Sequence, residues 1–379
     1  MAGAQDILAL SKKYNGFTKP QYSFKINGTE VDEKFCNQEI EVELCAGYEA
    51  SYAKISIRNA FLRDDKKPEI FTEKELQSVL KLGNTIQIFM GYAAERKADM
   101  TEVFSGYIDA IYLEYEHGDE VVYFIECLDG KGIMMNSLHS ETKKSVKKLS
   151  LAAEDVLKKY SSVIKIDGQG IDKGDEEVKM PIEQHNESDY DFVVRLAKKL
   201  NYDFYINAGK LYYRSVKKRD RNVTMKYHIN EYIKHFEFRF SLKDVVKSVT
   251  VRTNDETDPT KIFEGTATGY SNSVENGNVT AGSVSKLLTD RNAKTILDYS
   301  VSSVSEAKER AEAELTAEAF FLGSGHVLTP GIPELFPGSV VEVEGFGELY
   351  DRKYYVTKVK HRIKHNHFTT RCEIEVNKF

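Results

Sequence analysis

Apolar and polar residues alternate at every second position over much of this chain, and this pattern limits its fold more than any other feature. A period of two residues is typical of strands that bury one face of a sheet. Residues 20–130 hold several such segments, separated by turn signals such as Asn27-Gly28 at intervals of roughly ten residues. The clearest apolar sets are Tyr22, Phe24 and Ile26, then Ile40, Val42 and Leu44, then Ile55 and Ile57. The pattern predicts a compact antiparallel β domain, either a barrel or a sandwich.

One short helix is expected to interrupt these strands. Thr72 and Glu75 have the spacing of a capping box, and Gly83 provides a helix end. Beyond this helix, strands are predicted at residues 85–90, 103–115 and 120–128, with the last two joined across 117–119.

The pattern changes between residues 131 and 230. Ser150 is expected to cap one helix and Ser188 a second one, with Asp191 at the third helical position of the second helix. An apolar stripe on the second helix is made by Phe192, Val193, Leu196, Ala197 and Leu200. Its other face, with Arg195, Lys198 and Lys199, is expected to point to solvent. A hairpin at 202–213 follows, so this part is predicted to be an α+β insert.

Strand patterns return after residue 231. Phe236, Phe238 and Phe240 alternate, residues 304–322 have the clearest helical period of the chain, and the polar stretch 271–282 is predicted to be a long loop. Further strands are predicted at 245–252, 339–344, 354–363 and 370–376. We therefore predict a mainly β fold in which two β domains, the second with one helix, flank an α+β insert. The predicted units are 1–130, 131–230 and 231–379.

The charge pattern does not favour a nucleic-acid partner. The chain has 53 Lys and Arg against 59 Asp and Glu, and the two signs are interspersed. Two basic runs are interpreted as solvated surface: Lys143, Lys144, Lys147 and Lys148, then Arg214, Lys217, Lys218, Arg219 and Arg221.

The N-terminus and the cysteines favour a protein that is made and folded in the cytoplasm. No stretch approaches the roughly 20 apolar residues that span a bilayer, and the N-terminus lacks a signal-peptide pattern, so no membrane span is expected. Cys36, Cys45, Cys127 and Cys372 lie beside strand-like apolar residues, which favours buried free thiols in a reducing compartment.

The common catalytic motifs HExxH, GxSxG, GxxxxGK[ST] and GxGxxG do not occur in the sequence, and neither does an EF-hand loop. A strand would place His361, His365 and His367 on one face, where imidazoles share metal ions, but a hairpin tip at Asn366 explains the segment better. The acidic pairs Asp64-Asp65 and Glu176-Glu177 are weak candidates for glycosidase carboxylates. Rows of Tyr and Phe are more typical of a β-barrel core than of a stacking platform. We therefore expect no enzyme activity, no cofactor and no catalytic, cofactor-binding or metal-binding residues.

Several segments occur in an order that resembles a known family. They are residues 103–108 (VFSGYI) with 124–129 (FIECLD), 188–197 (SDYDFVVRLA) leading into 202–213, and 307–315, 331–338 (GIPELFPG) and 355–361 (YVTKVKH). Together these segments resemble the late-control D proteins of contractile-tailed phages. These are baseplate hub proteins, and the same family forms the base of the VgrG spike in type VI secretion.

The resemblance implies that both β domains are antiparallel β-barrels like tail-tube proteins, flanking the α+β insert, and that the chain forms a homotrimer. Three chains then present six similar barrels to a hexameric tail tube and join it to a trimeric central spike. The spike is expected to be a separate protein, since this chain stops at Phe379. Other baseplate proteins are further expected partners. The chain is expected to assemble in the bacterial cytoplasm and to be located in the baseplate of a phage virion or a phage-tail-like particle.

Two other functions stay open at this point. One is a tail-associated cell-wall hydrolase or glycan-binding protein, which the many acidic and aromatic residues favour. The other is an intracellular enzyme of unknown chemistry. The sequence does not distinguish a phage from a bacteriocin or a cellular injection system, and the insert is expected on the spike-facing or outer side of the ring.

Overall fold

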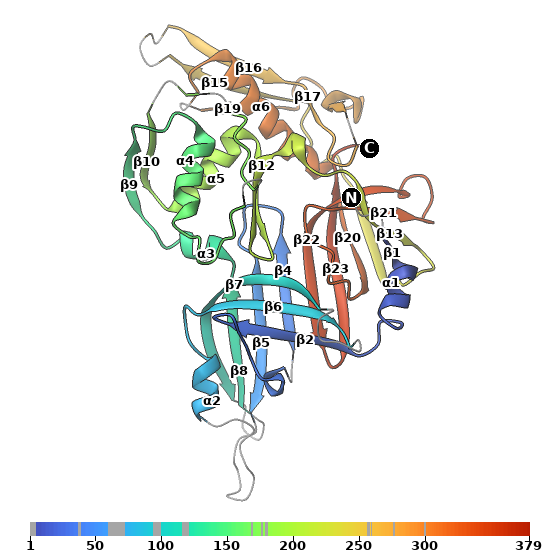
Figure 1. Ribbon diagram of the computed structural model, residues 1–379. Coiled ribbons are helices and arrows are strands. Elements are labelled where there is room, and N and C mark those ends of the chain that lie inside the picture. Colours follow the sequence, from blue (N-terminus) through green and yellow to red (C-terminus); the bar gives the residue numbers. More distant parts are fainter. Residues whose placement is uncertain are drawn as a thin grey trace, which may run out of the picture.

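The computed structural model describes residues 5–379 apart from 37–38, 60–72, 94–99, 116–120, 168–169, 176, 179–180, 256–257, 259, 276 and 299–300. Strands fill the centre and the lower part of the molecule in Figure 1, and helices α4, α5 and α6 lie above them. The mainly β fold with an α+β insert is thus confirmed.

The strands of the N-terminal half lie side by side in the order β2, β6, β7, β8, β5, β4, and all neighbours are antiparallel. Their bounds are β2 (Pro20–Ile26), β4 (Ile40–Cys45), β5 (Tyr52–Asn59), β6 (Thr85–Tyr92), β7 (Thr101–Tyr115) and β8 (Val121–Leu128). The short strand β3 (Thr29–Glu30) pairs with β2. The alternating residues Phe24, Val42 and Ile55 are fully buried, which confirms the period-two interpretation. The predicted short helix is α2 (Glu73–Val79), while Thr72 and the turn 117–119 lie outside the described residues.

The C-terminal half has the strand order β13, β21, β22, β23, β20, β14. Their bounds are β13 (Val223–His228), β14 (His235–Phe240), β20 (Gly323–Pro330), β21 (Val340–Glu344), β22 (Arg352–Lys364) and β23 (His367–Val376). Only the pair of β13 and β21 is parallel within this order. Strand β1 (Gln5–Asp6) also pairs with β13, and helix α1 (Ile7–Lys13) follows it. The alternation of Phe236, Phe238 and Phe240 is confirmed as strand β14.

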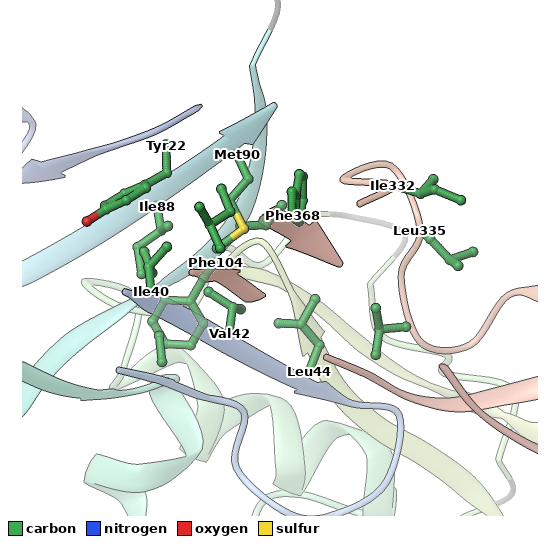
Figure 2. Close-up of a cluster of buried hydrophobic side chains, with 14 of the residues drawn as sticks. Tyr22, Ile40, Val42, Leu44, Ile88, Met90, Phe104, Ile332, Leu335 and Phe368 are labelled. Carbon is green, nitrogen blue, oxygen red and sulfur yellow. The ribbon is translucent and has the colours of Figure 1, made fainter. Parts of the chain in front are cut away.

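The two halves are joined edge to edge, because β4 of the first pairs with β22 of the second. One sheet therefore runs through both halves. The hydrophobic core is shared as well: Val42 and Leu44 lie in one cluster with Leu335 and Phe368 (Figure 2). Full burial of one such aliphatic side chain stabilises the fold by about 1.5–3 kcal/mol.

The insert has a hydrophobic cluster of its own. Its elements are α3 (Gly130–Met134), β9 (His139–Lys143), α4 (Leu149–Lys158), β10 (Ile182–Glu187), α5 (Asp189–Leu200), β11 (Tyr202–Asn207) and β12 (Lys210–Ser215). The predicted hairpin is confirmed as β11 and β12. Ser150 is not the N-cap of α4, because the helix begins at Leu149 and the cap residue is Lys148. Ser150 lies in the first turn of the helix, where its hydroxyl and its N–H both donate to the carboxylate of Asp175, the N–H at 3.0 Å.

A third cluster lies at the top of Figure 1, where α6 (Val304–Glu318) packs on β15 (Ser248–Asn254) and β16 (Ile262–Ala267). Strand β19 (Ala293–Leu297) pairs with β15, and η5 (Ala319–Leu322) continues α6, so the helix expected at 304–322 is confirmed. The stretch 271–282 is not one long loop. It forms a short hairpin of β17 (Gly269–Ser271) and β18 (Asn278–Thr280), because Tyr270 and Val279 are buried in spite of their polar neighbours.

Within the described part of the chain, no helix has the length and apolar character needed to cross a membrane.

Candidate assembly surface

The seam, defined here as the pairing of β4 with β22, is the feature that unites the two halves. Its register runs from Ile40 opposite Ile363 to Cys45 opposite Lys358. Alternation divides its side chains into an inner and an outer set. Ile40, Val42 and Val359 on the inner face are fully buried. The inner face thus belongs to the shared core, and the outer face is left to polar side chains.

The outer face of the seam sets acidic residues of β4 against basic residues of β22. The ion pairs are Lys360 with Glu41 at 2.6 Å, Lys364 with Glu39 at 2.9 Å, and Arg362 with Glu39. Half-exposed pairs of this kind contribute only about 0.2–1 kcal/mol each. A one-residue slip would turn these charged side chains toward the core, so alternation excludes it. The opposite charges of the two rows favour the pairing of β4 with β22.

Glu39 illustrates the electrostatics of the seam. Burial alone would raise the pKa of its carboxyl group, but hydrogen bonds and attraction from Lys364 and Arg362 outweigh burial. The pKa of Glu39 therefore lies below its usual value, and the carboxylate is charged at neutral pH.

The three histidines considered as metal ligands do not come together. His361 is fully buried in the core side of β22, where its Nδ1 is 2.9 Å from Thr370 Oγ1 and its Nε2 is 3.2 Å from the carbonyl oxygen of Leu335. Burial lowers its pKa to about 4, so the ring is neutral. His365 and Asn366 have positive φ angles at the tip of the β22–β23 hairpin, as the sequence predicted for Asn366. His361 is therefore a buried, hydrogen-bonded residue of the core beneath the seam.

A different group of possible ligands was not anticipated from the sequence. His235, Glu237 and His326 have ligand atoms within 4.8 Å of one another on β14 and β20, and the two imidazole rings stack 4.8 Å apart. Glu237 lies opposite His326 in the register of these strands, which brings residues 89 positions apart into contact. Spacing along the chain gives no signal for such a pair.

The acidic pairs remain unconnected to any site. Asp64, Asp65 and Glu176 lie outside the described residues, and Glu177 is exposed. The four cysteines are free thiols, and Cys45, Cys127 and Cys372 are buried as expected.

A buried ion pair within the insert holds Arg219 against Tyr355 of the C-terminal half. Arg219 donates Nε to Asp203 Oδ2 at 2.8 Å and Nη2 to Asp203 Oδ1 at 2.6 Å, and its guanidinium lies 4.3 Å from the ring centre of Tyr355. Burial alone would lower the pKa of Arg219, but the Asp203 carboxylate outweighs it and raises that pKa. The interpretation of Arg219 as solvated surface was therefore wrong. Lys143 is also buried, so that interpretation fails there too.

A second buried pair links the start of the insert to the loop after β4. Asp129 accepts the N–H groups of Ser51 at 2.8 Å and of Lys131 at 2.9 Å. The ammonium group of Lys131 donates to the carbonyl oxygens of Gly47 and Glu49. Burial raises the pKa of Asp129 and lowers that of Lys131. These contacts hold the first turn of the insert against the N-terminal half.

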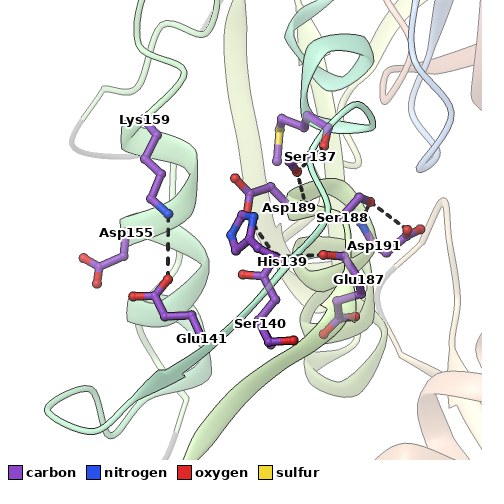
Figure 3. A network of polar contacts seen from close by, with 12 residues as sticks. Ser137, His139, Ser140, Glu141, Asp155, Lys159, Glu187, Ser188, Asp189 and Asp191 are labelled. Carbon is purple, nitrogen blue, oxygen red and sulfur yellow. Dashed lines mark hydrogen bonds and ion pairs between the residues drawn. The ribbon is translucent and has the colours of Figure 1, made fainter.

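Helix α5 is held inside the insert by the polar network of Figure 3. Ser188 is the N-cap and accepts the N–H of Asp191 at 2.9 Å, as predicted. Asp189 donates its N–H to Ser137 Oγ at 2.7 Å, and its carboxylate lies 3.2 Å from His139 Nε2. Along the helix, Arg195 and Lys198 are exposed as predicted, but Lys199 is half-buried and burial lowers its pKa. Lys199 is less exposed than Arg195 and Lys198 because α5 packs against α6.

An open cleft of about 990 Å³ lies where the insert, the seam and α6 meet. Its lining residues include Tyr48, Asn201, Arg310, Tyr355 and Glu375. Burial raises the pKa of Glu375 to about 7, while the positive charges of Arg219 and Lys358 act in the opposite direction. The cleft is thus lined by groups that also hold the units together.

Glu375 gives a pH-dependent prediction. Its pKa in the folded protein, about 7, lies above its unfolded value of about 4.3. Its contribution to stability is present below the unfolded pKa and is lost as the pH rises toward 7. We expect Glu375→Gln to raise the melting temperature at pH 8 and to change it much less at pH 4.5. The half-exposed Glu373→Gln is the control, and an equal effect of both changes at pH 8 would contradict the assignment.

The fold is that of phage tail proteins. The 43 kDa tail protein of prophage MuSo2 from Shewanella oneidensis superposes with a TM-score of 0.67 at 15% identity, covering 94% of this chain and 98% of that chain. The tail protein from Neisseria meningitidis MC58 gives 0.66 at 11% identity, covering 94% of this chain and 96% of the other. A chain of the Francisella PdpA–VgrG complex gives 0.57 at 13% identity, with 97% of this chain covering 54% of that one.

These likenesses confirm, at the level of the fold, the resemblance to tail and baseplate hub proteins seen in the sequence. Among curated protein sequences, none matches this chain. The family model described as the Alg8 N-terminal domain matches residues 18–365, which is most of the chain. The chain therefore belongs to the Alg8 N-terminal domain family.

Proposed function

We propose that this protein is the structural baseplate hub of a contractile phage tail or of a phage-tail-like injection particle. In this role it is a homotrimeric adaptor that joins the hexameric tail tube to a separate trimeric central spike. The observation that carries the proposal is the duplicated strand order: two six-stranded units lie edge to edge in one chain. The fold shared with phage tail proteins supports it.

The duplication would match a three-fold hub to a six-fold tube. A trimer has three identical positions, whereas a hexameric tube has six. A chain with two similar β units offers six similar positions as a trimer. The units are proposed as 1–130 and 231–379, with β13 (Val223–His228) added to the second because it pairs with β21. The insert, proposed as 131–230, then lies outside the ring of barrels, on the spike-facing or outer side. The proposed role is structural and needs no cofactor.

The test is the assembly state together with capture of the partners. We expect equilibrium sedimentation to give a trimer, alone or with the spike protein, and we expect the trimer to retain the tube protein in a pull-down. A monomer under both conditions would overturn the proposal. The exposed Lys144 and Lys147 lie on the insert, so Lys144→Glu with Lys147→Glu should leave tube capture unchanged. Loss of tube capture with spike binding intact would reverse the proposed orientation.

A further inference from the structure

The two halves repeat one another down to single hydrogen bonds. Gly83 and Gly338 both have positive φ angles, +79° and +85°, directly before β6 and β21. Gly83 donates its N–H to the carbonyl of Ile108 at 2.9 Å, and Gly338 donates to that of Val356 at 2.8 Å. In return, Ile108 donates to Asn84 at 2.9 Å and Val356 to Ser339 at 2.9 Å. Ile108 therefore corresponds to Val356.

The two long hairpins carry the repeat further. The β7–β8 register shifts between Ile108 and Ala110, and the β22–β23 register shifts between Val356 and Lys358. The bulge is therefore in the same place in both hairpins, and residues 110–114 of β7 correspond to 358–362 of β22.

These corresponding segments differ in one respect. In β22 the edge at 358–362 is covered by β4, and His361 is fully buried. In β7 the pairing with β6 ends at Tyr107, and no described strand pairs with that edge beyond it. Leu113, which corresponds to His361, is 56% exposed. The N-terminal half thus has a vacant strand position where the C-terminal half has β4.

The strand that corresponds to β4 is β14. Glu43 lies opposite Tyr52, which lies opposite Leu128. In the other half Arg239 lies opposite Ser324, which lies opposite Glu375. Leu128 and Glu375 correspond, because they face Tyr107 and Tyr355 in the two hairpins. Glu43 therefore corresponds to Arg239, and the alternating Phe236, Phe238 and Phe240 take the places of Ile40, Val42 and Leu44.

β14 has β20 as its partner among the described strands, so its second edge is open. We propose that β14 of one copy pairs antiparallel with residues 110–114 of β7 in a second copy, which repeats the seam between chains. This inference rests on the proposed trimer and specifies its interface. Transfer of the seam register gives the pairs Ala110–Ser241, Ile111–Phe240, Tyr112–Arg239, Leu113–Phe238 and Glu114–Glu237.

The apolar side chains at these positions favour the pairing, whereas Glu114 opposite Glu237 is a like-charge pair that weakens it. Leu113 and Ile111 would meet Phe238 and Phe240 on the inner face, and aromatic–aliphatic cross-strand pairs are favourable. On the outer face Arg239 would meet Tyr112, whose ring stacks on Phe124 at 4.9 Å and whose hydroxyl donates to Glu126 at 3.2 Å. An uncovered apolar strand edge is a hazard for aggregation, and a second copy would remove it.

Disulfide formation tests the register directly. In the seam, Ala46 donates its N–H to Thr357 at 2.8 Å, so the next pair, Cys45 with Lys358, is a non-hydrogen-bonded pair. Ala110 and Ser241 take these places, where Cα atoms lie about 4.5 Å apart, within disulfide range. We expect Ala110→Cys with Ser241→Cys to give a covalent trimer on a non-reducing gel, which a reductant returns to monomer.

Matched variants control for chance contacts. A mixture of two proteins, one carrying only Ala110→Cys and the other only Ser241→Cys, should give a covalent dimer and nothing larger. Glu114→Cys with Ser241→Cys should not crosslink, because four residues along a strand separate the thiols by roughly 13 Å. Leu113→Asp should abolish the trimer while the monomer stays folded by circular dichroism. Leu297→Asp is its control, at a side chain that is 63% exposed and lies on β19, which pairs with β15 in the third cluster.

The outcomes separate the two proposals. A trimer in sedimentation that neither crosslinks at Ala110 and Ser241 nor responds to Leu113→Asp would overturn the strand pairing and leave the hub proposal standing. A monomer with and without the spike protein would overturn both. Crosslinking of the control pair at Glu114 would show that the register is wrong.

Discussion

Replacing Asp203 with Ala is expected to lower the free energy of unfolding by about 3–5 kcal/mol, because Arg219 is left as a buried charge without its carboxylate. The exposed fractions of the two side chains are 6% for Asp203 and 11% for Arg219. The pair is bidentate, and Arg219 also covers the ring of Tyr355 on β22. The change should therefore loosen the insert from the C-terminal half as well as destabilise the chain.

Urea denaturation measures this effect. Asp290→Ala is a suitable control, since Asp290 also pairs with a cation, Lys247, but its side chain is 97% exposed. We expect no measurable change in the midpoint for the control. An Asp203 variant with the midpoint of the unchanged protein would show that Arg219 does not depend on this carboxylate.

The second large effect is expected for Leu196→Asp on α5. Leu196 is 1% exposed within the insert's own hydrophobic cluster. Loss of the buried leucine costs about 2–5 kcal/mol, and burial of an unpaired carboxylate costs several kcal/mol more. We expect the insert to unfold, while the shared core of the two halves, which does not contain Leu196, remains folded.

Hydrogen exchange distinguishes local from global unfolding. Amides of α4 and α5 should lose their protection, and amides of β22 and β23 should keep theirs. Lys198→Ala, at an exposed position two residues along the same helix, should leave both regions protected. Protection of α5 in the Leu196 variant would show that its apolar stripe is not what holds the insert together.

Local patterns in the sequence were sufficient for most elements. The alternation of Phe236, Phe238 and Phe240 predicted β14, and Ser188 with Asp191 predicted the start of α5. Each depends on residues close together in the chain. The two predictions that failed, the Ser150 cap and the loop at 271–282, depend on residues farther along the chain. Ser150 donates its hydroxyl to Asp175, and Tyr270 donates its hydroxyl to the carbonyl of Asn377, more than 100 residues away.

The site was less predictable than the fold for the same reason. The seam joins residues about 320 positions apart, and a period of two says which face of a strand is buried but not which strand lies beside it. One signal for the duplication was present in the sequence. The segments 83–88 (GNTIQI) and 338–343 (GSVVEV) share a leading glycine and the same alternation, and a search for internal repeats would have paired them.

The pairing of β4 with β22 also has a consequence for synthesis on the ribosome. At about 5–20 residues per second, β4 leaves the ribosome roughly 15–60 s before the strand that covers its edge. During this time the edge is open to other nascent chains, and contacts so distant in sequence form slowly. Glu39, Glu41 and Glu43 give this waiting edge a row of negative charge, which repels a second copy of the same strand. The acidic residues that later bind β22 thus protect the unfinished chain from self-association.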